Sequence, residues 1–135
     1  MKYINIIITC ICFLFALGLD SADIGGFAAL WDPISLIIVM VPSYLLTATA
    51  YNSYNFFNNK KSVQLFGNLA IGFGLIGTIV GLIYTLTTMT IPPPSGVDPG
   101  SILISNLAIS IITLLYGFLI KYFIALPLAH SIKDK

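Results

Sequence analysis

The chain has 135 residues, of which 58% are hydrophobic and only 8% are charged, and its formal net charge is +1. A soluble domain of this size needs a charged surface, so this composition excludes an ordinary soluble fold. Continuous apolar runs, each close to the roughly 20 residues that a helix needs to cross a bilayer, predict an all-α integral membrane protein with four transmembrane helices per chain. A transmembrane β-barrel would instead show alternating apolar and polar residues.

The first apolar run, residues 3–19, is predicted to be a transmembrane helix. It follows Met1 and Lys2 and ends in a segment with small residues, 16–22, a pattern that also fits a secretory signal peptide with its cleavage site. The charge pattern does not decide between the two interpretations, because the other lysines fall on the same side of the membrane whether this segment is kept or cleaved.

The second predicted transmembrane helix covers residues 34–51. Asp32 can cap its N-terminus, and Pro33 suits a first turn, where no backbone donor is needed. Pro42 removes a backbone hydrogen bond in the middle of the helix, so a kink is expected there. The polar loop that follows, residues 52–64, is too short to form a soluble domain.

The third predicted helix, residues 65–89, has one face made of small or hydroxylated side chains. The residues that recur on this face at helical spacing are Ala70, Gly74, Gly77, Thr78, Gly81 and Thr85. Glycine disfavours helices, so its accumulation on one face indicates close approach of another backbone. A proline-rich turn at residues 91–100 ends the helix.

The fourth predicted helix, residues 101–129, carries a second stripe with the same spacing. Its members are Asn106, Ser110, Thr113, Gly117 and Lys121. The lysine can extend its amino group to the membrane interface. The spacing leaves two explanations open: the two stripes pack against each other, or copies of both helices line a central polar passage.

The charges orient this single membrane domain, residues 1–135. With four spans, one side of the membrane holds Lys2, Lys60, Lys61, Lys121, Lys133 and Lys135, and the other holds Asp20, Asp23, Asp32 and Asp98. The positive-inside rule therefore predicts that both termini and the 52–64 loop lie in the cytoplasm.

The predicted spans contain no Asp, Glu, Arg or His. Proton relays and coupled transporters ordinarily place an ionisable group at membrane depth, so a partner has to bring one if protons cross here. The sequence also lacks a nucleophile constellation, a metal-ligand cluster and a phosphate-binding loop. We therefore expect no enzymatic activity, no cofactor, no metal site and no nucleic-acid partner.

Three ordered blocks stand out in the chain: residues 30–39 (LWDPISLIIV), residues 74–83 (GLIGTIVGLI) and residues 106–117 (NLAISIITLLYG), the last followed by Pro127. The second and third blocks resemble the third-helix and fourth-helix signatures of the MotA/TolQ/ExbB proton-channel family. The first is similar to the start of the second helix in MotA-type members.

The resemblance implies an ion-channel, stator-like subunit of an energy-transducing motor in the bacterial inner membrane. Five copies would surround two single-span partners of the MotB/TolR/ExbD type, and a partner aspartate would carry the ion. The helices at 65–89 and 101–129 would line the pore, with Thr78 and Thr113 facing the aspartate. The other pore-lining positions would be Ser110, Asn106 and Thr85, and the positions packing against the partner helix would be Ala70, Gly74, Gly77, Gly81 and Gly117.

The sequence also departs from the family pattern. MotA-type proteins carry a large cytoplasmic domain where this chain has only residues 52–64, so rotor engagement through such a domain is not expected. Leu114 stands where many members have a second hydroxyl beside Thr113, which favours protons over sodium. A non-conducting membrane scaffold and a small four-helix transporter subunit are the alternatives, and the missing membrane carboxylate disfavours the transporter.

Overall fold

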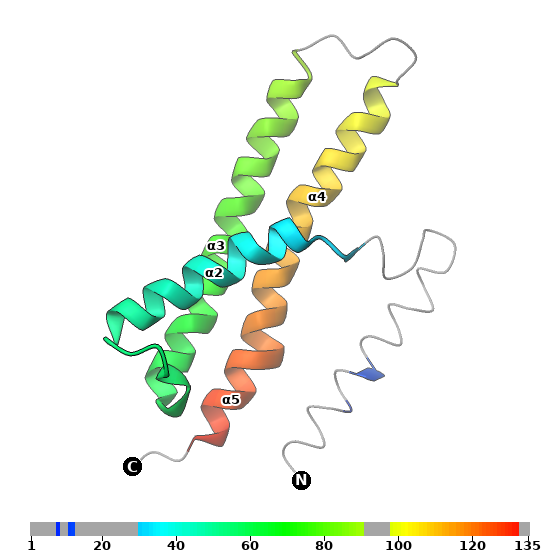
Figure 1. The fold of residues 1–135 in the computed structure, drawn as a ribbon. Coiled ribbons are helices and arrows are strands. Elements are labelled where there is room, and N and C mark those ends of the chain that lie inside the picture. Colours follow the sequence, from blue (N-terminus) through cyan, green and yellow to red (C-terminus); the bar gives the residue numbers. More distant parts are fainter. Residues whose placement is uncertain (1–7, 9–10, 13–29, 91–97, 133–135) are drawn as a thin grey trace. The chain divides into compact units, whose positions relative to one another are not determined.

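The computed structural model describes residues 30–90 and 98–132, together with residues 8, 11 and 12 (Figure 1). Its elements are α2 (Pro33–Ala50), η3 (Phe56–Asn58), α3 (Lys60–Thr88), α4 (Pro99–Leu119), the π-helix η4 (Ile120–Ala125) and α5 (Leu126–Ser131). No strand occurs among the described residues. The helix expected over 3–19 and most of the expected proline-rich turn lie outside them. The chain divides into two compact units, Met1–Pro33 and Ile34–Lys135.

Three described helices are long and apolar enough to cross a bilayer: Pro33–Ala50, Lys60–Thr88 and the continuous stretch Pro99–Ser131. The prediction of an all-helical membrane protein is confirmed by these elements. Many of their large apolar side chains point outward, including Tyr84, which is 68% exposed, and Ile104, which is 71% exposed. Such surfaces are stable only against lipid or other protein chains.

The buried side of α2 consists mainly of small residues one helical turn apart: Ser35, Val39, Ser43 and Thr47. The hydroxyl of Ser43 donates to the carbonyl of Val39 at 2.6 Å, and that of Thr47 donates to the carbonyl of Ser43 at 2.7 Å. These bonds satisfy the buried hydroxyls within the helix itself, so α2 needs no polar partner there.

A short, tightly bonded turn joins α2 to α3. The hydroxyl of Tyr44 on α2 donates to the carbonyl of Tyr54 at 2.8 Å, and the hydroxyl of Ser62 on α3 has the carbonyls of Phe56 and Asn59 within hydrogen-bond distance. The side chain of Asn59 accepts from the backbone N–H of Lys61 at 3.0 Å. This cap starts α3 at Lys60, earlier than the expected residue 65, because it satisfies a backbone donor that would otherwise be orphaned.

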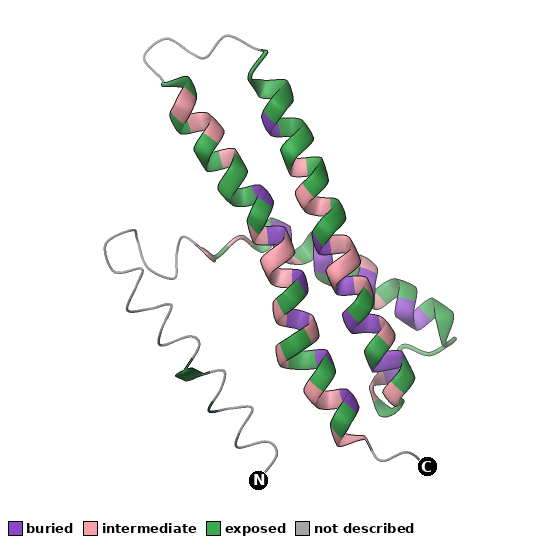
Figure 2. Cartoon of the chain, turned by 180° about the vertical axis from the view of Figure 1, so that it is seen from behind, coloured by how far each residue is buried: buried purple, intermediate pink, exposed green. Residues whose placement is uncertain are grey.

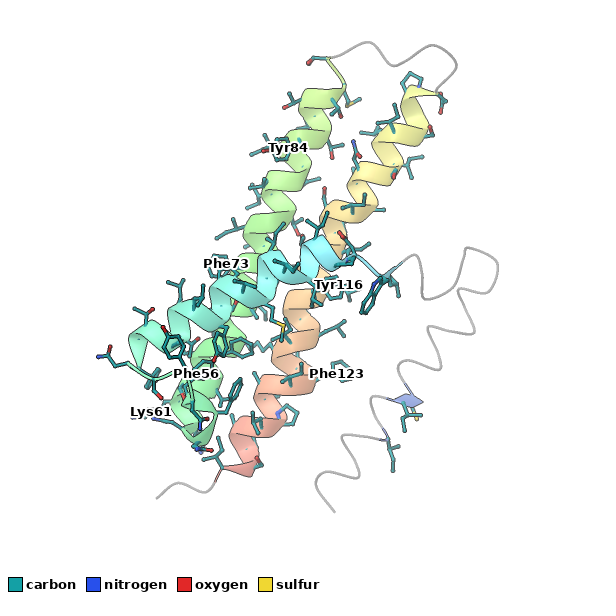
Figure 3. All side chains as sticks on the ribbon, viewed as in Figure 1. Phe56, Lys61, Phe73, Tyr84, Tyr116 and Phe123 are labelled. Carbon is teal, nitrogen blue, oxygen red and sulfur yellow. The ribbon has the colours of Figure 1, made fainter. Side chains whose placement is uncertain are left out.

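An aromatic cluster covers this turn. The ring of Phe56, which is 2% exposed, lies 5.2 Å from the ring of Tyr44, 4.6 Å from Phe57 and 5.9 Å from Phe66. Figure 3 shows Phe56 near the end of the helices where Lys61 lies. The segment that was predicted only as a polar loop, residues 52–64, therefore has a small apolar core of its own.

α3 and α4 run side by side and form the main packing interface of the described chain (Figure 1). Burial is concentrated toward the start of α3 and toward η4 and α5, which continue α4, as Figure 2 shows. The buried apolar residues there are Val63, Phe66, Ala70, Ile120, Ala125 and Ala129. This core holds the two helices in a fixed register.

A π-helical turn interrupts the helix that was expected to run regularly over 101–129. The N–H of Leu126 donates to the carbonyl of Lys121, five residues earlier. A regular helix would turn Ile124 toward α3, but Ile124 is 47% exposed and Ala125 is 2% exposed. Pro127 supplies the reason, because its ring collides with the carbonyl four residues earlier in a regular α-helix. The wider turn gives the ring room and shifts the buried face by one residue.

Candidate functional site

The backbones of α3 and α4 meet directly at two glycines. A methyl group at Gly117 would lie 2.6 Å from the carbonyl oxygen of Ala70, and one at Gly74 would lie 2.9 Å from the carbonyl oxygen of Thr113. Both distances are shorter than real carbon–oxygen contacts, and the neighbouring atoms belong to backbone, which cannot rotate away. Only glycine fits at these positions, as in the small-residue contacts common between membrane helices.

Two further glycines continue the contact, but against side chains. A methyl group at Gly77 would lie 3.2 Å from the Cβ of Thr113, and one at Gly81 would lie 2.8 Å from the Cβ of Ser110. Gly77 and Gly81 are partly exposed, whereas Ala70, Gly74 and Gly117 are buried. All five residues predicted to pack against a partner helix therefore lie at the α3–α4 contact of their own chain, and two of them keep an open side.

The two predicted pore threonines are brought together across this interface. The hydroxyl oxygens of Thr78 and Thr113 lie 3.0 Å apart. Thr78 also reaches the carbonyl of Gly74 at 2.9 Å, and Thr113 reaches the carbonyl of Ser110 at 2.6 Å. The two hydroxyls have only two hydrogens for these three contacts, because each hydroxyl donates once. One of them must give up its backbone acceptor whenever the threonine–threonine bond forms.

The remaining predicted pore residues follow the same interface toward the start of α4. The hydroxyl of Ser110 donates to the carbonyl of Asn106 at 2.7 Å, and that of Thr85 donates to the carbonyl of Gly81 at 2.8 Å. Both hydroxyls are buried, with Ser110 3% and Thr85 1% exposed. Each bonds its own helix, so neither crosses from α3 to α4.

Sequence reasoning missed Thr88. The side-chain amide of Asn106 lies 3.5 Å from the hydroxyl of Thr88, which itself donates to the carbonyl of Thr85 at 2.8 Å. Thr88 stands one turn after Thr85 on the same face of α3, so the helical spacing could have found it. The hydroxyl stripe thus extends from Thr78 and Thr113 to Thr88 and the Asp98 end of α4, where Asn106 lies.

The described site is neutral throughout. No Asp, Glu, Lys, Arg or His lies between Ser62 and Thr90 or between Pro99 and Ile120. Among the described residues no group of three or more His, Cys, Asp or Glu side chains could hold a metal ion. What the site offers chemically is a row of hydroxyl groups, which can donate a hydrogen bond to an anion and accept one from an acid.

Comparison with known proteins gives two matches. A sequence-family model described as the MotA/TolQ/ExbB proton channel family matches residues 43–135, which include all of α3 and α4. Motility protein A of Aquifex aeolicus (strain VF5) is 29% identical over 109 residues, which cover 77% of this chain and 40% of the relative. The chain therefore spans less than half the length of that relative. No solved structure matches the chain.

Proposed function

Because the chain belongs to the MotA/TolQ/ExbB proton channel family, we propose that it is an ion-channel, stator-like subunit of a motor driven by the ion-motive force. The observation that carries this proposal is the 3.0 Å contact between the hydroxyls of Thr78 and Thr113 within an uncharged stretch of membrane helix. An uncharged channel needs a titratable group from elsewhere, so the partner would supply an aspartate.

The threonine pair suits a carboxyl group that changes its protonation state. A hydroxyl donates to an ionised carboxylate and accepts from a protonated carboxyl group. Thr78 is partly exposed and has a backbone acceptor in reach, so its hydroxyl can turn between that acceptor and a carboxyl group without opening the helix. Thr113 is 4% exposed and would act through its contact with Thr78. Both forms of the partner's aspartate would then find a hydrogen-bonding group at the same place, which lowers the energetic cost of passing an ion.

We further propose a ring of five copies with α3 and α4 facing inward around two single-span partners of the MotB/TolR/ExbD type. The broad apolar surfaces of the described helices support this, because within one chain only 17% of an apolar 18-residue stretch of α3 is buried. Gly77 and Gly81, which are partly exposed, would let a partner helix approach, and Ala70, Gly74 and Gly117 would hold the inward-facing helices together.

The same proposal includes the membrane and its orientation. The chain would lie in the bacterial inner membrane with a fourth span over residues 3–19 and with both termini in the cytoplasm. The lysines support this orientation, because Lys60 and Lys61 begin α3 and Lys121 lies just after the end of α4, while Asp98 caps the opposite end of α4.

A non-conducting scaffold is the second candidate function. The observation in its favour is that the closest glycine contacts, at Gly74 and Gly117, are made within the chain and need no pore. A small transporter subunit has no comparable support, because the described spans hold no carboxylate that could couple a substrate to protons.

The assembly is tested by native mass spectrometry of the complex extracted in detergent. The chain is expressed alone and then together with a single-span protein of the MotB/TolR/ExbD type from the same organism. We expect five copies of the chain, and two copies of the partner when it is present. A monomer or dimer that takes up no partner would contradict the ring and favour the scaffold.

A further inference from the structure

We propose that the pocket beside the π-helical turn binds the phosphate group of an anionic phospholipid. The pocket has a volume of about 260 Å³ and lies between the first turns of α3 and the segment where η4 meets α5. It is lined by Gln64, Gly67, Asn68, Lys121, Ala125 and Leu126. It is separate from the threonine pair, and the proposal does not depend on ion conduction.

The polar side chains of the pocket are suited to an oxyanion. The ammonium group of Lys121 offers three donors and a positive charge, and the amides of Gln64 and Asn68 offer two donors each. Within the described part of the chain Lys121 forms no ion pair; its nitrogen lies 5.7 Å from the centre of the Tyr122 ring. A positive charge with amide donors on one side and no carboxylate among the lining residues favours an anion.

The local backbone creates the pocket. Gly67 has no side chain, and a methyl group there would lie 2.7 Å from the Cβ of Ala125 and 3.4 Å from the Cγ of Lys121. The hydrogen bonds of the π turn span five residues, so this turn is wider than an α-helical turn. As a result, Lys121 and Ala125 both face α3. The stem of Lys121 therefore lies against α3 at Gly67, and Lys121 lines the same pocket as Gln64 and Asn68.

The position along the helices matches the depth of lipid headgroups. Lys121 lies roughly 34 Å along the helix from Asp98, at 1.5 Å per residue, and the hydrocarbon layer of a bilayer is about 30 Å thick. No charged residue lies between them in the sequence. Asp98 and Lys121 thus mark opposite interfaces, and the pocket opens where phospholipid phosphates lie, on the side of Lys60 and Lys61.

The test is a lipid titration of the purified, delipidated full-length chain, with bound lipids counted by native mass spectrometry. Phosphatidylglycerol is compared with phosphatidylcholine, whose phosphate is balanced by a positive headgroup. We expect preferential retention of phosphatidylglycerol and about tenfold weaker retention in the Lys121→Gln variant, the size expected for a lost hydrogen bond to a charged group. Lys121→Arg should restore retention, because it keeps the charge.

Lys61→Gln is the matched control, since it removes a positive charge from the same side of the membrane but does not line the pocket. We expect it to weaken retention by no more than about fivefold, the size expected for a lysine that acts only through the charge of the surface. Asn68→Leu removes a donor at similar volume and should weaken retention without removing charge. Circular dichroism of each variant checks that the helices are intact.

Inorganic phosphate added to the chain loaded with phosphatidylglycerol distinguishes a site for phosphate alone from a site for the intact lipid. If millimolar phosphate displaces phosphatidylglycerol, the site recognises the phosphate group itself. If it does not, the site recognises the intact lipid. Either result supports the anion site, provided that Lys121→Gln weakens binding. Equal retention of both lipids, or equal losses in Lys121→Gln and Lys61→Gln, would overturn the proposal.

Discussion

The two halves of the α3–α4 pair are held together by different means. In the half next to the α2–α3 turn, backbone meets backbone at Gly74 and Gly117, and buried apolar residues surround the contact. In the half toward Asp98, hydroxyl groups at Thr85 and Ser110 bond their own helices, and the polar contact between Asn106 and Thr88 is 3.5 Å long. The Thr78–Thr113 contact lies at the boundary between the two halves.

This difference indicates which part of the pair is fixed and which can open. Backbone contacts and a buried apolar core tolerate no separation without loss of packing, so the half near Lys60 is the fixed end. Hydroxyls that are satisfied within their own helix leave no buried polar group unpaired when the helices part. We therefore expect the half near Asp98 to separate at a lower cost than the half near Lys60, with the threonine pair where the separation would begin.

The largest expected effect on stability follows substitution in the fixed half. Gly117→Val adds a side chain where even a methyl group would lie 2.6 Å from the carbonyl oxygen of Ala70, so we expect a loss of about 1–3 kcal/mol in unfolding free energy. Denaturant titration in mixed micelles measures it. Gly72→Ala is the matched control, because a methyl group at Gly72 has nothing within 4 Å and should be neutral or slightly stabilising. Equal losses in both variants would show that the backbone contact at Gly117 does not limit the size of the side chain there.

A smaller effect is expected at Gly81, in the half that can open. A methyl group there meets the side chain of Ser110, which can move, so Gly81→Ala should cost about 1 kcal/mol in the same titration. The double variant Gly81→Ala, Ser110→Gly removes the obstructing side chain and should recover most of the loss, which gives a coupling energy between the two sites. Strict additivity of the two substitutions would show that these residues do not meet.

The smallest effect is expected at the end of the stripe. Asn106→Leu removes an amide whose distance of 3.5 Å from the Thr88 hydroxyl is at the limit of a hydrogen bond, so the unfolding free energy should change by less than about 0.5 kcal/mol. A loss several times larger would mean that this contact ties the two helices together and that the half near Asp98 does not open easily.

The sequence predicted the apolar helices and the faces on which they meet, because both depend on spacing and composition. Gly74, Gly77, Gly81 and Gly117 all lie at the interface that their pattern indicated. Of the two explanations left open by spacing, packing of the stripes against each other is observed within one chain, and the pore assignment stays a proposal.

Other features depend on local geometry that spacing does not encode. The π turn shifts the face of the last helix by one residue, so a regular helical pattern could not predict that Ala125, rather than Ile124, faces α3. Pro127 was the available signal, since proline disturbs the preceding turn. The early start of α3 follows from the cap made by Asn59, and a sequence with several neighbouring asparagines does not single that one out.

The most direct test of the proposed ion pathway is partner-dependent proton flux into vesicles that contain the chain and its single-span partner. Thr113→Val and Thr78→Val keep side-chain volume but remove the paired hydroxyls, and Thr87→Val removes an exposed hydroxyl that bonds the carbonyl of Ile83 in its own helix. With assembly verified for all variants, we predict about a tenfold loss of flux for the first two, as expected for a lost hydrogen bond to a charged group, and none for the third. Unchanged flux in both Thr113→Val and Thr78→Val would contradict the pathway.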